Sequence, residues 1–530
     1  MKRWILCAAI LAALCSVLSA QDKGQEESAF QVASIFTDHM VLQRGSSVPV
    51  WGWAEPGTKV TAFPSWDKHF YTATAASDGR WKMRVATPVA GGGPYTLTLS
   101  AGKKERIFLQ DVMIGEVWLC SGQSNMALSM IGGTSQGVVG AFEQIAEAPE
   151  YADRIRFFDI KDGKAFEPQT SVKCKWERTD GAVTANVSAV GYLFAKRLTR
   201  SLGVPVGIIA NPWGGCLLPP WMPVEYLEKY VKGQIPDEKY QAILDRRDAP
   251  DPDRNAPRQV GTMYNARMYP VKGYAIRGFV WYQGCSELIF NDIAYYDKLQ
   301  AAMVRCWRDM WGDTEDKLPF YFTLLAPYGY SHPEGEGRGY FVENQLASLD
   351  IIPNSGVAVT ETLGDIGCIH PGRKQEVADQ FAVLALERVY GVGTGLGNGA
   401  FAHPDWVSFP ADSPVEVRKI HQSGYDLDIR KSDRADDTIV LHFVDTRIGL
   451  GHYSDYGFPV KGFEVAGADR VFHPVPALAN LDNIVIDCSG IEGPVAVRYA
   501  FHNWCEADLQ TALGIPVASF RTDDWPMTSK

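Results

Sequence analysis

A serine stands at position 124 in the stretch SGQSNM (121–126), directly after the short, mostly apolar run EVWLC (116–120). That run predicts a buried strand, and a helical segment follows the turn. A hydroxyl at the end of such a strand lies near helix N-terminal amides, which stabilise a developing oxyanion. The pattern therefore predicts nucleophilic chemistry at Ser124. A serine that only caps a helix is the alternative interpretation of the same residues.

A nucleophilic serine needs a base, which has to come from another part of the chain. His370 has a suitable setting, because it follows a predicted strand within GDIGCIHP (364–371) and precedes a predicted helix over 373–390. We therefore predict that His370 removes the proton from Ser124. For any single histidine, a purely structural role is the simpler alternative.

The elements that must position these residues change in type along the chain. From about residue 30 to 109 the sequence alternates and turns like a small antiparallel sandwich, with strands at 48–53 and 95–100. From 116 onward strands alternate with helices, and from about 403 the pattern returns to strands. The alternating segments are strands at 204–210, 276–282 and 319–325, and helices at 189–198, 296–311 and 373–390.

Strands that alternate with helices predict an α/β fold, a parallel sheet with helices on both faces, whose ligands bind beyond the carboxyl ends of the strands. We expect this catalytic domain to lie between two β-sandwich-like domains. The charged, Pro-flanked stretch 236–257 indicates an insertion over the catalytic domain. The predicted ranges are an N-terminal β domain at 28–108, the catalytic domain at 109–400 with its insertion at about 224–262, and a C-terminal β domain at 401–530.

The first twenty residues have the pattern of a secretory signal peptide. Lys2 and Arg3 precede an apolar run, which ends at Ser19 and Ala20 before polar residues. The run is short for a membrane-spanning helix. A lipoprotein attached through Cys15 is an alternative that the preceding leucine disfavours. We expect cleavage near Ala20 and a periplasmic or extracellular protein with no membrane anchor.

Composition excludes several classes of protein. Of the 530 residues, 46% are hydrophobic and 21% charged, which is typical of a folded protein and not of a disordered one. The net charge of −11, with no basic run, argues against a nucleic-acid partner. No CxxC and no His/Cys cluster is present, so we predict no structural metal. Eight cysteines follow the signal peptide, and their sequence positions do not determine how they pair.

Ordered blocks along the chain resemble the sialate O-acetylesterase family, a branch of the SGNH hydrolases. The most specific block is GEVWLCSGQSNM (115–126). The other blocks are DHMVLQ (38–43), SAVGY (188–192), PVGIIANPWGG (205–215), YNA (264–266), WYQG (281–284), IHP (369–371) with Lys374, VRY (497–499) and FRTD (520–523). The similarity spans nearly the whole chain after the signal peptide.

The resemblance implies a three-layer SGNH catalytic domain that removes acetyl groups from sugar hydroxyls, with no metal or organic cofactor. Carried over to this chain, Ser124 is the nucleophile and His370 the general base and then acid. The oxyanion is held by the backbone N–H groups of Ser124 and Gly215, with the side chain of Gln283 as a third donor.

The chain also departs from the family pattern. After WYQG the family usually continues Glu-Ser-Asn, where this chain has Cys285, Ser286 and Glu287. SGNH enzymes usually place an aspartate three residues before the histidine, where this chain has a glycine. Asp365, five residues before, orients the imidazole only if the loop bends differently. The alternative is a Ser–His dyad whose imidazole is held by a backbone carbonyl. A non-catalytic glycan-binding protein on a degenerate esterase fold is the alternative from another class.

Within the esterase interpretation, acetylated sialic acid is the expected substrate, and acetylated plant polysaccharide such as xylan is the alternative. A sialate carboxylate requires a cation, for which Arg267 is the candidate, beside Asn265 in the third block. The oligomeric state does not follow from the sequence. Two further cysteines, Cys285 and Cys368, stand on loops expected to converge at the site. They can form a disulfide in an exported protein, or remain two independent buried thiols.

Overall fold

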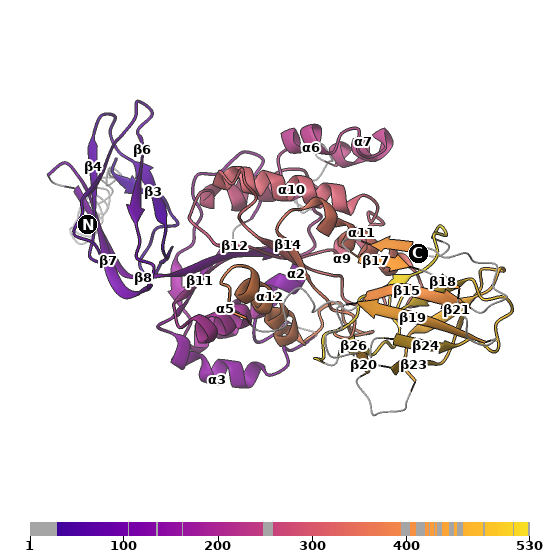
Figure 1. Cartoon of the computed structure of the whole chain (residues 1–530). Coiled ribbons are helices and arrows are strands. Elements are labelled where there is room, and N and C mark those ends of the chain that lie inside the picture. The colour runs from indigo at the N-terminus through magenta and orange to yellow at the C-terminus, as the bar shows by residue number, and fades with distance from the viewer. Residues whose placement is uncertain are drawn as a thin grey trace, which may run out of the picture.

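The computed structural model of the chain shows three regions in a row (Figure 1). N-terminal strands lie at one end, a mixed sheet with helices lies in the middle, and C-terminal strands lie at the other end. The described residues are 29–103, 105–133, 136–161, 163–246, 258–393, 403–409, 419–422, 425–428, 430–431, 437–444, 450–452, 459–480, 483–511 and 513–527. The predicted signal peptide and part of the predicted insertion lie outside these residues.

Two antiparallel sheets form the N-terminal region, as the alternating sequence predicts. In β6 (Arg80–Ala86) every second side chain is buried, so one face of the strand packs inward and the other meets solvent. The three-stranded sheet contains β1 (Gln31–Val32), β3 (Ser47–Trp53) and β6. The second sheet contains β4 (Lys59–Pro64), β5 (Tyr71–Thr74), β7 (Gly92–Ala101) and the first half of β8 (Glu105–Gly122).

Strand β8 belongs to both the N-terminal and the middle region. Its first half pairs antiparallel with β7, and its second half pairs parallel with β11 (Val206–Pro212) and β12 (Gly278–Tyr282). The expected domain boundary at 108/109 therefore lies inside a strand. The order in the middle sheet is β10-β9-β11-β8-β12-β13-β14, with β10 antiparallel to β9. The remaining bounds are β2 (Val41–Gln43), β9 (Ile155–Asp159), β10 (Trp176–Arg178), β13 (Phe320–Thr323) and β14 (Ser355–Ala358).

Helices cover both faces of the middle sheet (Figure 1). On one face lie α3 (Ala141–Tyr151), α5 (Ala189–Leu202) and α12 (Lys374–Arg388). On the other lie α6 (Val224–Tyr230), α7 (Asp237–Asp245), α10 (Tyr296–Trp311) and α11 (Gly337–Ile351). The shorter helices are α2 (Ser124–Ala127), α4 (Gly181–Asn186), α9 (Cys285–Ile289), η1 (Pro219–Trp221), η3 (Tyr264–Met268) and η4 (Tyr269–Val271).

Successive residues of β8 face the two helical layers in turn. Trp118 and Cys120 pack into one hydrophobic cluster with Phe194 of α5, whereas Leu119 packs into the other cluster with Trp307 of α10. Because both faces of this part of the strand are covered, residues 117–120 are all apolar rather than alternating. This explains why residues 116–120 predict a buried strand. In the described residues no helix is both long and apolar enough to cross a bilayer.

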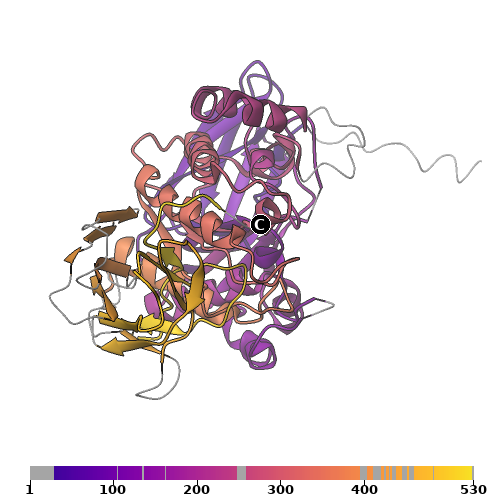
Figure 2. The ribbon, with the colours of Figure 1, turned by 90° about the vertical axis from the view of Figure 1, so that its right-hand side faces the viewer.

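The C-terminal region is built from strands, as predicted, and Figure 2 views it from its own side. One sheet has the order β18-β15-β19-β24-β23 and another the order β22-β21-β25-β27. The bounds are β15 (His403–Phe409), β16 (Lys419–Gln422), β17 (Tyr425–Asp428), β18 (Arg430–Lys431), β19 (Thr438–Val444), β20 (Leu450–His452), β21 (Phe463–Ala466), β22 (Phe472–Pro474), β23 (Ala477–Asn480), β24 (Asn483–Asp487), β25 (Ala496–Tyr499), β26 (Leu509–Thr511) and β27 (Phe520–Arg521).

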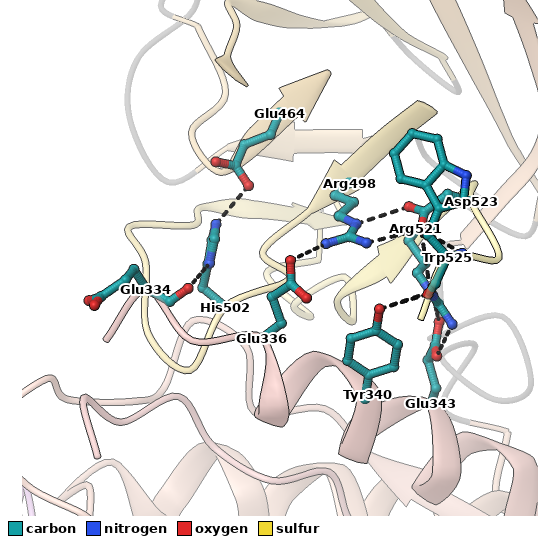
Figure 3. A network of polar contacts seen from close by, with 10 residues as sticks. All are labelled: Glu334, Glu336, Tyr340, Glu343, Glu464, Arg498, His502, Arg521, Asp523 and Trp525. Carbon is teal, nitrogen blue, oxygen red and sulfur yellow. Dashed lines mark hydrogen bonds and ion pairs between the residues drawn. The ribbon is translucent and has the colours of Figure 1, made fainter. Parts of the chain in front are cut away.

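Two arginines of the C-terminal blocks join this region to α11 (Figure 3). Arg498 of β25 donates to Glu336, just before α11, at 2.6 Å, and forms two hydrogen bonds with Asp523 at 2.9 and 3.0 Å. Arg521 of β27 pairs with Glu343 of α11 at 2.6 and 3.0 Å. The VRY and FRTD blocks thus hold the C-terminal strands against the middle region.

His502 lies in the same interface, between Glu464 and the carbonyl of Glu334 (Figure 3). Burial alone lowers the pKa of His502, but the hydrogen bond and charge of Glu464, 2.7 Å from Nε2, outweigh it and raise the pKa above 6.5. A raised folded-state pKa adds stability that is fully present below the unfolded pKa, near 6.5, and is lost as pH rises through the folded pKa.

We therefore expect His502→Gln to lower the free energy of unfolding most at about pH 6, with the loss shrinking as pH is raised to about 9. Urea unfolding across this range measures the effect. His473→Gln, at an exposed histidine of the same region, is the matched control. A loss for His502→Gln that does not change with pH would contradict the role of the imidazolium.

Candidate active site

Ser124 stands where the sequence pattern predicts, at the first position of α2 and two residues after β8 ends. Gly122 makes this turn possible, because its φ of +133° suits glycine and a Cβ there would lie 2.2 Å from the carbonyl oxygen of Tyr282. The turn brings Ser124 to the carboxyl edge of the sheet, with its side chain half-buried. The residue is therefore at the position where α/β sheets bind ligands.

His370 reaches Ser124 from a loop after β14. Its Nε2 lies 2.8 Å from Oγ of Ser124, although the two residues are 246 positions apart in the chain. Burial, and after it the charge of Lys374, lowers the pKa of His370 below 6.5. At neutral pH the imidazole is therefore uncharged and able to accept the hydroxyl proton, as a general base must.

The structure does not bring Asp365 to the imidazole. Its carboxylate instead accepts the N–H of Gly367 at 2.8 Å and the side-chain amide of Gln136 at 3.5 Å. The expectation that Asp365 orients His370 is not met, because the loop closes a turn on the aspartate itself. The dyad alternative is not met in its stated form either. No protein oxygen in the described residues accepts a hydrogen bond from Nδ1 of His370.

From this geometry we expect Asp365→Asn to lower kcat/KM by less than about tenfold, since an orienting carboxylate contributes far more than that when it bonds the imidazole. Hydrolysis of p-nitrophenyl acetate measures the effect. Asp379→Asn, at a carboxylate of α12 that pairs with Arg197, is the control. A fall of several hundredfold for Asp365→Asn alone would show that the loop rearranges to bring the carboxylate to His370.

Two backbone N–H groups at the site are available for an oxyanion. The loop after β11 passes beside Ser124: the N–H of Trp213 donates to the carbonyl of Gly122 at 2.9 Å, and a Cβ on Gly214 would lie 3.8 Å from the Cβ of Ser124. In the described part of the chain, no protein group accepts a hydrogen bond from the N–H of Ser124 or of Gly215. Gly215 has a φ of +71°, which glycine adopts without strain.

The structure does not present Gln283 to the oxyanion. Its side-chain amide donates to the carbonyl of Cys216 at 3.1 Å and to Glu287, and its oxygen accepts the hydroxyl of Tyr296 at 2.8 Å. Both N–H groups of the amide are thus already used. Gln283 instead holds the loop that contains Gly215, through the carbonyl of Cys216, and it is not a third oxyanion donor in this arrangement.

Glu287, one of the departures from the family pattern, also lies behind this loop and not in the site. It is buried and accepts the N–H of Leu218 at 2.9 Å. Burial raises its pKa to about 8, so the carboxyl group is mostly protonated at neutral pH.

A buried network behind the dyad escaped the sequence analysis. Lys374, the first residue of α12, is fully buried, and its Nζ donates to Oδ1 of Asn125 at 2.5 Å. Nδ2 of Asn125 donates to the carbonyl of Ile369 at 3.0 Å. Asn125 follows Ser124, and Ile369 precedes His370, so the network joins the two halves of the dyad through their neighbours. The only sequence signal was Lys374 in the last block, and a lysine at a helix start is usually exposed.

Lys374 faces no carboxylate in the described residues. The groups around it are the thiols of Cys285 and Cys368, the side chain of Asn125 and the ring of Tyr282, whose centroid is 4.9 Å from Nζ. Burial lowers the pKa of Lys374 to about 7.

Of the two alternatives for Cys285 and Cys368, the structure shows independent thiols, since each of the eight cysteines from Cys120 to Cys505 is a free thiol. The Cys285 thiol lies 3.7 Å from the amide of Asn125, whereas the Cys368 thiol turns toward the carbonyl of His370 at 3.6 Å. Both thiols flank Lys374, but they face different partners.

A cavity of about 430 Å³ lies on the Ser124 side of the site, where Gly214, the neighbour of Ser124, forms part of its wall, although neither Ser124 nor His370 lines it. Ala127 and Gly214 form the wall nearest Ser124. The rest of the lining comprises two cations, one carboxylate and five other residues: Lys161, Arg267, Asp159, Ile160, Asn186, Ser188, Pro212 and Trp213. The dimensions suit a monosaccharide-sized ligand. In the described residues no cluster of three or more His, Cys, Asp or Glu could hold a metal ion.

Arg267 lines this cavity but is 1% exposed and bonded to the fold. It donates to Oδ1 of Asn211 and to the carbonyl of Pro212, both at 2.9 Å. Asn265 does not line the cavity, and its side chain donates to the carbonyl of Ala165 at 3.3 Å. Lys161, whose side chain is 72% exposed, is the more accessible cation of the cavity, although it also lies 3.4 Å from Asp159.

Known proteins resemble this chain in sequence and in structure. Residues 114–365 match the profile of a family described as carbohydrate esterase, sialic acid-specific acetylesterase. The chain is 24% identical to mouse sialate O-acetylesterase over 530 aligned residues, covering 90% of both chains. It is 27% identical to the human sialate O-acetylesterase over 395 residues, covering 68% of this chain and 71% of the human one.

A solved structure matches as well. The crystal structure of a carbohydrate acetylesterase from Xanthomonas citri superimposes with a TM-score of 0.75 and 27% identity. The match covers 93% of this chain and the whole of the other. The mixed sheet and both flanking β-rich regions therefore have a counterpart in another acetylesterase.

Proposed function

Because the chain belongs to the sialic acid-specific acetylesterase family and is a carboxylic ester hydrolase, we propose that it removes O-acetyl groups from sialic acid by Ser–His nucleophilic catalysis. The observation that carries the mechanism is the 2.8 Å contact between His370 Nε2 and Ser124 Oγ. The helices on both faces of the middle sheet support a three-layer SGNH arrangement of the catalytic domain.

In the first half of the reaction, Oγ of Ser124 attacks the acetyl carbonyl carbon while Nε2 of His370 takes the hydroxyl proton. The backbone N–H groups of Ser124 and Gly215 receive the oxyanion, and each such donor contributes about 3 kcal/mol to the transition state. The bond between the acetyl carbon and the sugar oxygen then breaks. That oxygen takes the proton from Nε2, and acetyl-Ser124 remains.

In the second half, a water molecule attacks the acetyl-Ser124 carbonyl, and Nε2 of His370 takes a proton from the water. The same two N–H groups receive the second oxyanion. Collapse returns the proton to Oγ and releases acetate. The complete reaction consumes one water molecule for each acetyl ester. Every proton transfer passes through Nε2 of His370, the imidazole nitrogen that faces Ser124.

Lys374 and Asn125 act in this scheme as positioning residues. The Asn125 amide fixes the carbonyl next to His370, and the Lys374 amine fixes Asn125. The imidazole is thus oriented through the backbone of its loop. When charged, Lys374 also disfavours the imidazolium, which is the second cause of the lowered pKa of His370.

We expect Lys374→Met to lower kcat by roughly 10- to 100-fold, the equivalent of one charge-assisted hydrogen bond, with little change in KM. Because the variant lacks the nearby positive charge, the acidic limb of its pH profile should move to higher pH. Lys196→Met is the control, since Lys196 is nearly as buried but pairs with Gln144 and Glu147. If kcat fell while the acidic limb of the pH profile stayed at the same pH, the role of Lys374 would be limited to a structural one.

The substrate assignment rests on the cavity beside Ser124 together with the names of the relatives. Lys161 provides an accessible positive charge there for a sialate carboxylate, although it lies 3.4 Å from Asp159 of the same cavity, and Arg267 is buried in the wall. Acetylated plant polysaccharide is the alternative, since the Xanthomonas citri relative is described only as a carbohydrate acetylesterase. Residues 1–20 support export, so we propose that the enzyme acts in the periplasm or outside the cell.

Mass spectrometry of acetate loss from O-acetylated sialosides and O-acetylated xylo-oligosaccharides tests the substrate. We expect at least a tenfold higher kcat/KM for sialosides, since a charge-assisted contact contributes that much. Lys161→Ala should reduce this preference, whereas Lys173→Ala, at an exposed lysine outside the cavity, should not. A preference for xylo-oligosaccharides would replace sialate by the alternative substrate. No turnover of any acetyl ester would favour a glycan-binding role.

A further inference from the structure

A second cavity, of about 620 Å³, lies between the N-terminal strands and the helices of the middle region. Strands β3 and β6 form one wall, and helices α6, α10, η3 and η4 form the other. Neither Ser124 nor His370 lines it. Six aromatic residues do: Trp51, Trp53, Trp81, Tyr226, Tyr264 and Tyr269.

Contacts with neighbouring rings hold these aromatic walls in place. Trp51 packs edge-on against Phe36, with ring centroids 4.7 Å apart, and Tyr264 packs edge-on against Tyr269 at 6.1 Å. Trp51 and Trp53 are only partly buried, so part of each ring faces the cavity and solvent. Rigid aromatic walls with a few polar groups are typical of preformed ligand sites.

The charges on the cavity are mostly positive. Arg80, Lys82 and Lys272 line it, against the single carboxylate of Asp309. Asp309 is already bonded, because it accepts the hydroxyl of Tyr226 at 2.9 Å and pairs with Arg305 at 2.8 Å. In the described residues no carboxylate pairs with Lys82. Arg80 lies 3.6 Å from Asp78, and Lys272 lies over the ring of Tyr269. An anion that enters the cavity therefore meets the positive charges of Lys82 and Lys272, with which no carboxylate of the described residues pairs.

We propose that this cavity binds an acidic saccharide, a sugar ring that carries a carboxylate, at a site separate from the hydrolytic one. The apolar face of the ring would lie on the tryptophans, and the carboxylate would meet Lys82 and Lys272. A neutral sugar could stack on the aromatic rings, but it has no carboxylate to pair with the lysines. The inference goes beyond the proposed function, because it requires no hydrolysis at Ser124.

One short helix contributes a residue to each of the two cavities. Tyr264 at the start of η3 lines the cavity between the regions, and Arg267 in the same helix lines the cavity beside Ser124. The proposed saccharide site is thus close in sequence to the cavity on the Ser124 side.

The test uses the full chain with Ser124→Ala, labelled with 5-fluorotryptophan, and N-acetylneuraminic acid as the probe. Substitutions of Trp51, Trp53 and Trp81 by phenylalanine assign their ¹⁹F resonances. We expect these resonances to shift on titration, in addition to any shift of Trp213 in the catalytic cavity. Neutral N-acetylmannosamine should shift them at least about tenfold more weakly.

Lys82→Glu should weaken the titration by roughly tenfold, and Lys59→Glu, an exposed lysine of β4 outside the cavity, should leave it unchanged. In a chain with Ser124 intact, Lys82→Glu should keep its activity on p-nitrophenyl acetate, which shows that it folds. A shift of Trp213 alone, or an equal response to the neutral sugar, would overturn the proposal. Activity at Ser124 is measured separately, so failure of one inference does not affect the other.

Discussion

Ser124→Ala should lower the rate of ester hydrolysis by about 10⁴-fold or more, and His370→Ala by roughly 10²- to 10⁴-fold, with the fold intact. Both side chains lie at the edge of the sheet, so their removal opens no cavity in the core. Because nucleophile and base act as one unit, the double variant should be scarcely slower than Ser124→Ala alone. Single-turnover and steady-state hydrolysis of p-nitrophenyl acetate measure these effects.

The pH dependence provides an independent check on the base. The pKa of His370 is below 6.5, so kcat/KM should stay constant through neutral pH and fall only at more acidic pH, where the imidazole becomes protonated. Ser129→Ala is the control for the nucleophile, since this nearby serine only donates to the carbonyl of Gly132. If His370→Ala retained more than about a tenth of the activity, the base would have to be another group.

Arg338→Met should lower the free energy of unfolding by about 3–5 kcal/mol, because it leaves the carboxylate of Glu361 buried without its partner. Both side chains are 1% exposed, and they lie 2.6 Å apart. Glu361 also accepts the N–H of Ser519 at 3.1 Å, and Arg338 donates to the carbonyl of Leu325 at 2.9 Å. The pair thus joins the C-terminal strands to the middle region, and urea unfolding measures its loss.

The double variant Arg338→Met/Glu361→Met should recover much of that stability, because no uncompensated charge remains. Burial already raises the pKa of Glu361, and loss of the arginine raises it further, so Arg338→Met should be less destabilised as pH falls. Arg178→Met, at the exposed pair with Asp153, should cost less than about 1 kcal/mol. A double variant that is less stable than Arg338→Met would show that packing, and not charge, determines the effect.

Much of the catalytic framework could be predicted from the sequence. The apolar run before Ser124 has to be buried on both faces, and the strand-to-helix change around His370 places that residue at the same edge of the sheet. The family resemblance, which the comparisons confirm, identified the same two positions. These positions on the fold could be predicted because they depend only on the alternation of strands and helices, which the hydrophobic pattern of the sequence indicates directly.

The roles of Asp365 and Gln283 could not be predicted in the same way. Each depends on which of several nearby groups a side chain bonds: Asp365 bonds its own loop, and Gln283 bonds Cys216 and Glu287. The burial of Lys374 was equally hidden, because a lysine in the first turn of a helix normally reaches solvent. Sequence spacing gives the position of a residue on an element, but the partner of its side chain is decided by the loops around it.

The long strand β8 has a consequence for how this enzyme can change. One uninterrupted backbone of 18 residues runs from the N-terminal sheet to within two residues of Ser124. The N-terminal part is therefore not a module on a tether, and it cannot be removed or exchanged at a linker without cutting the strand that leads to Ser124. Recombination between relatives would preserve function only if it exchanged this strand together with the neighbours on both sides of it.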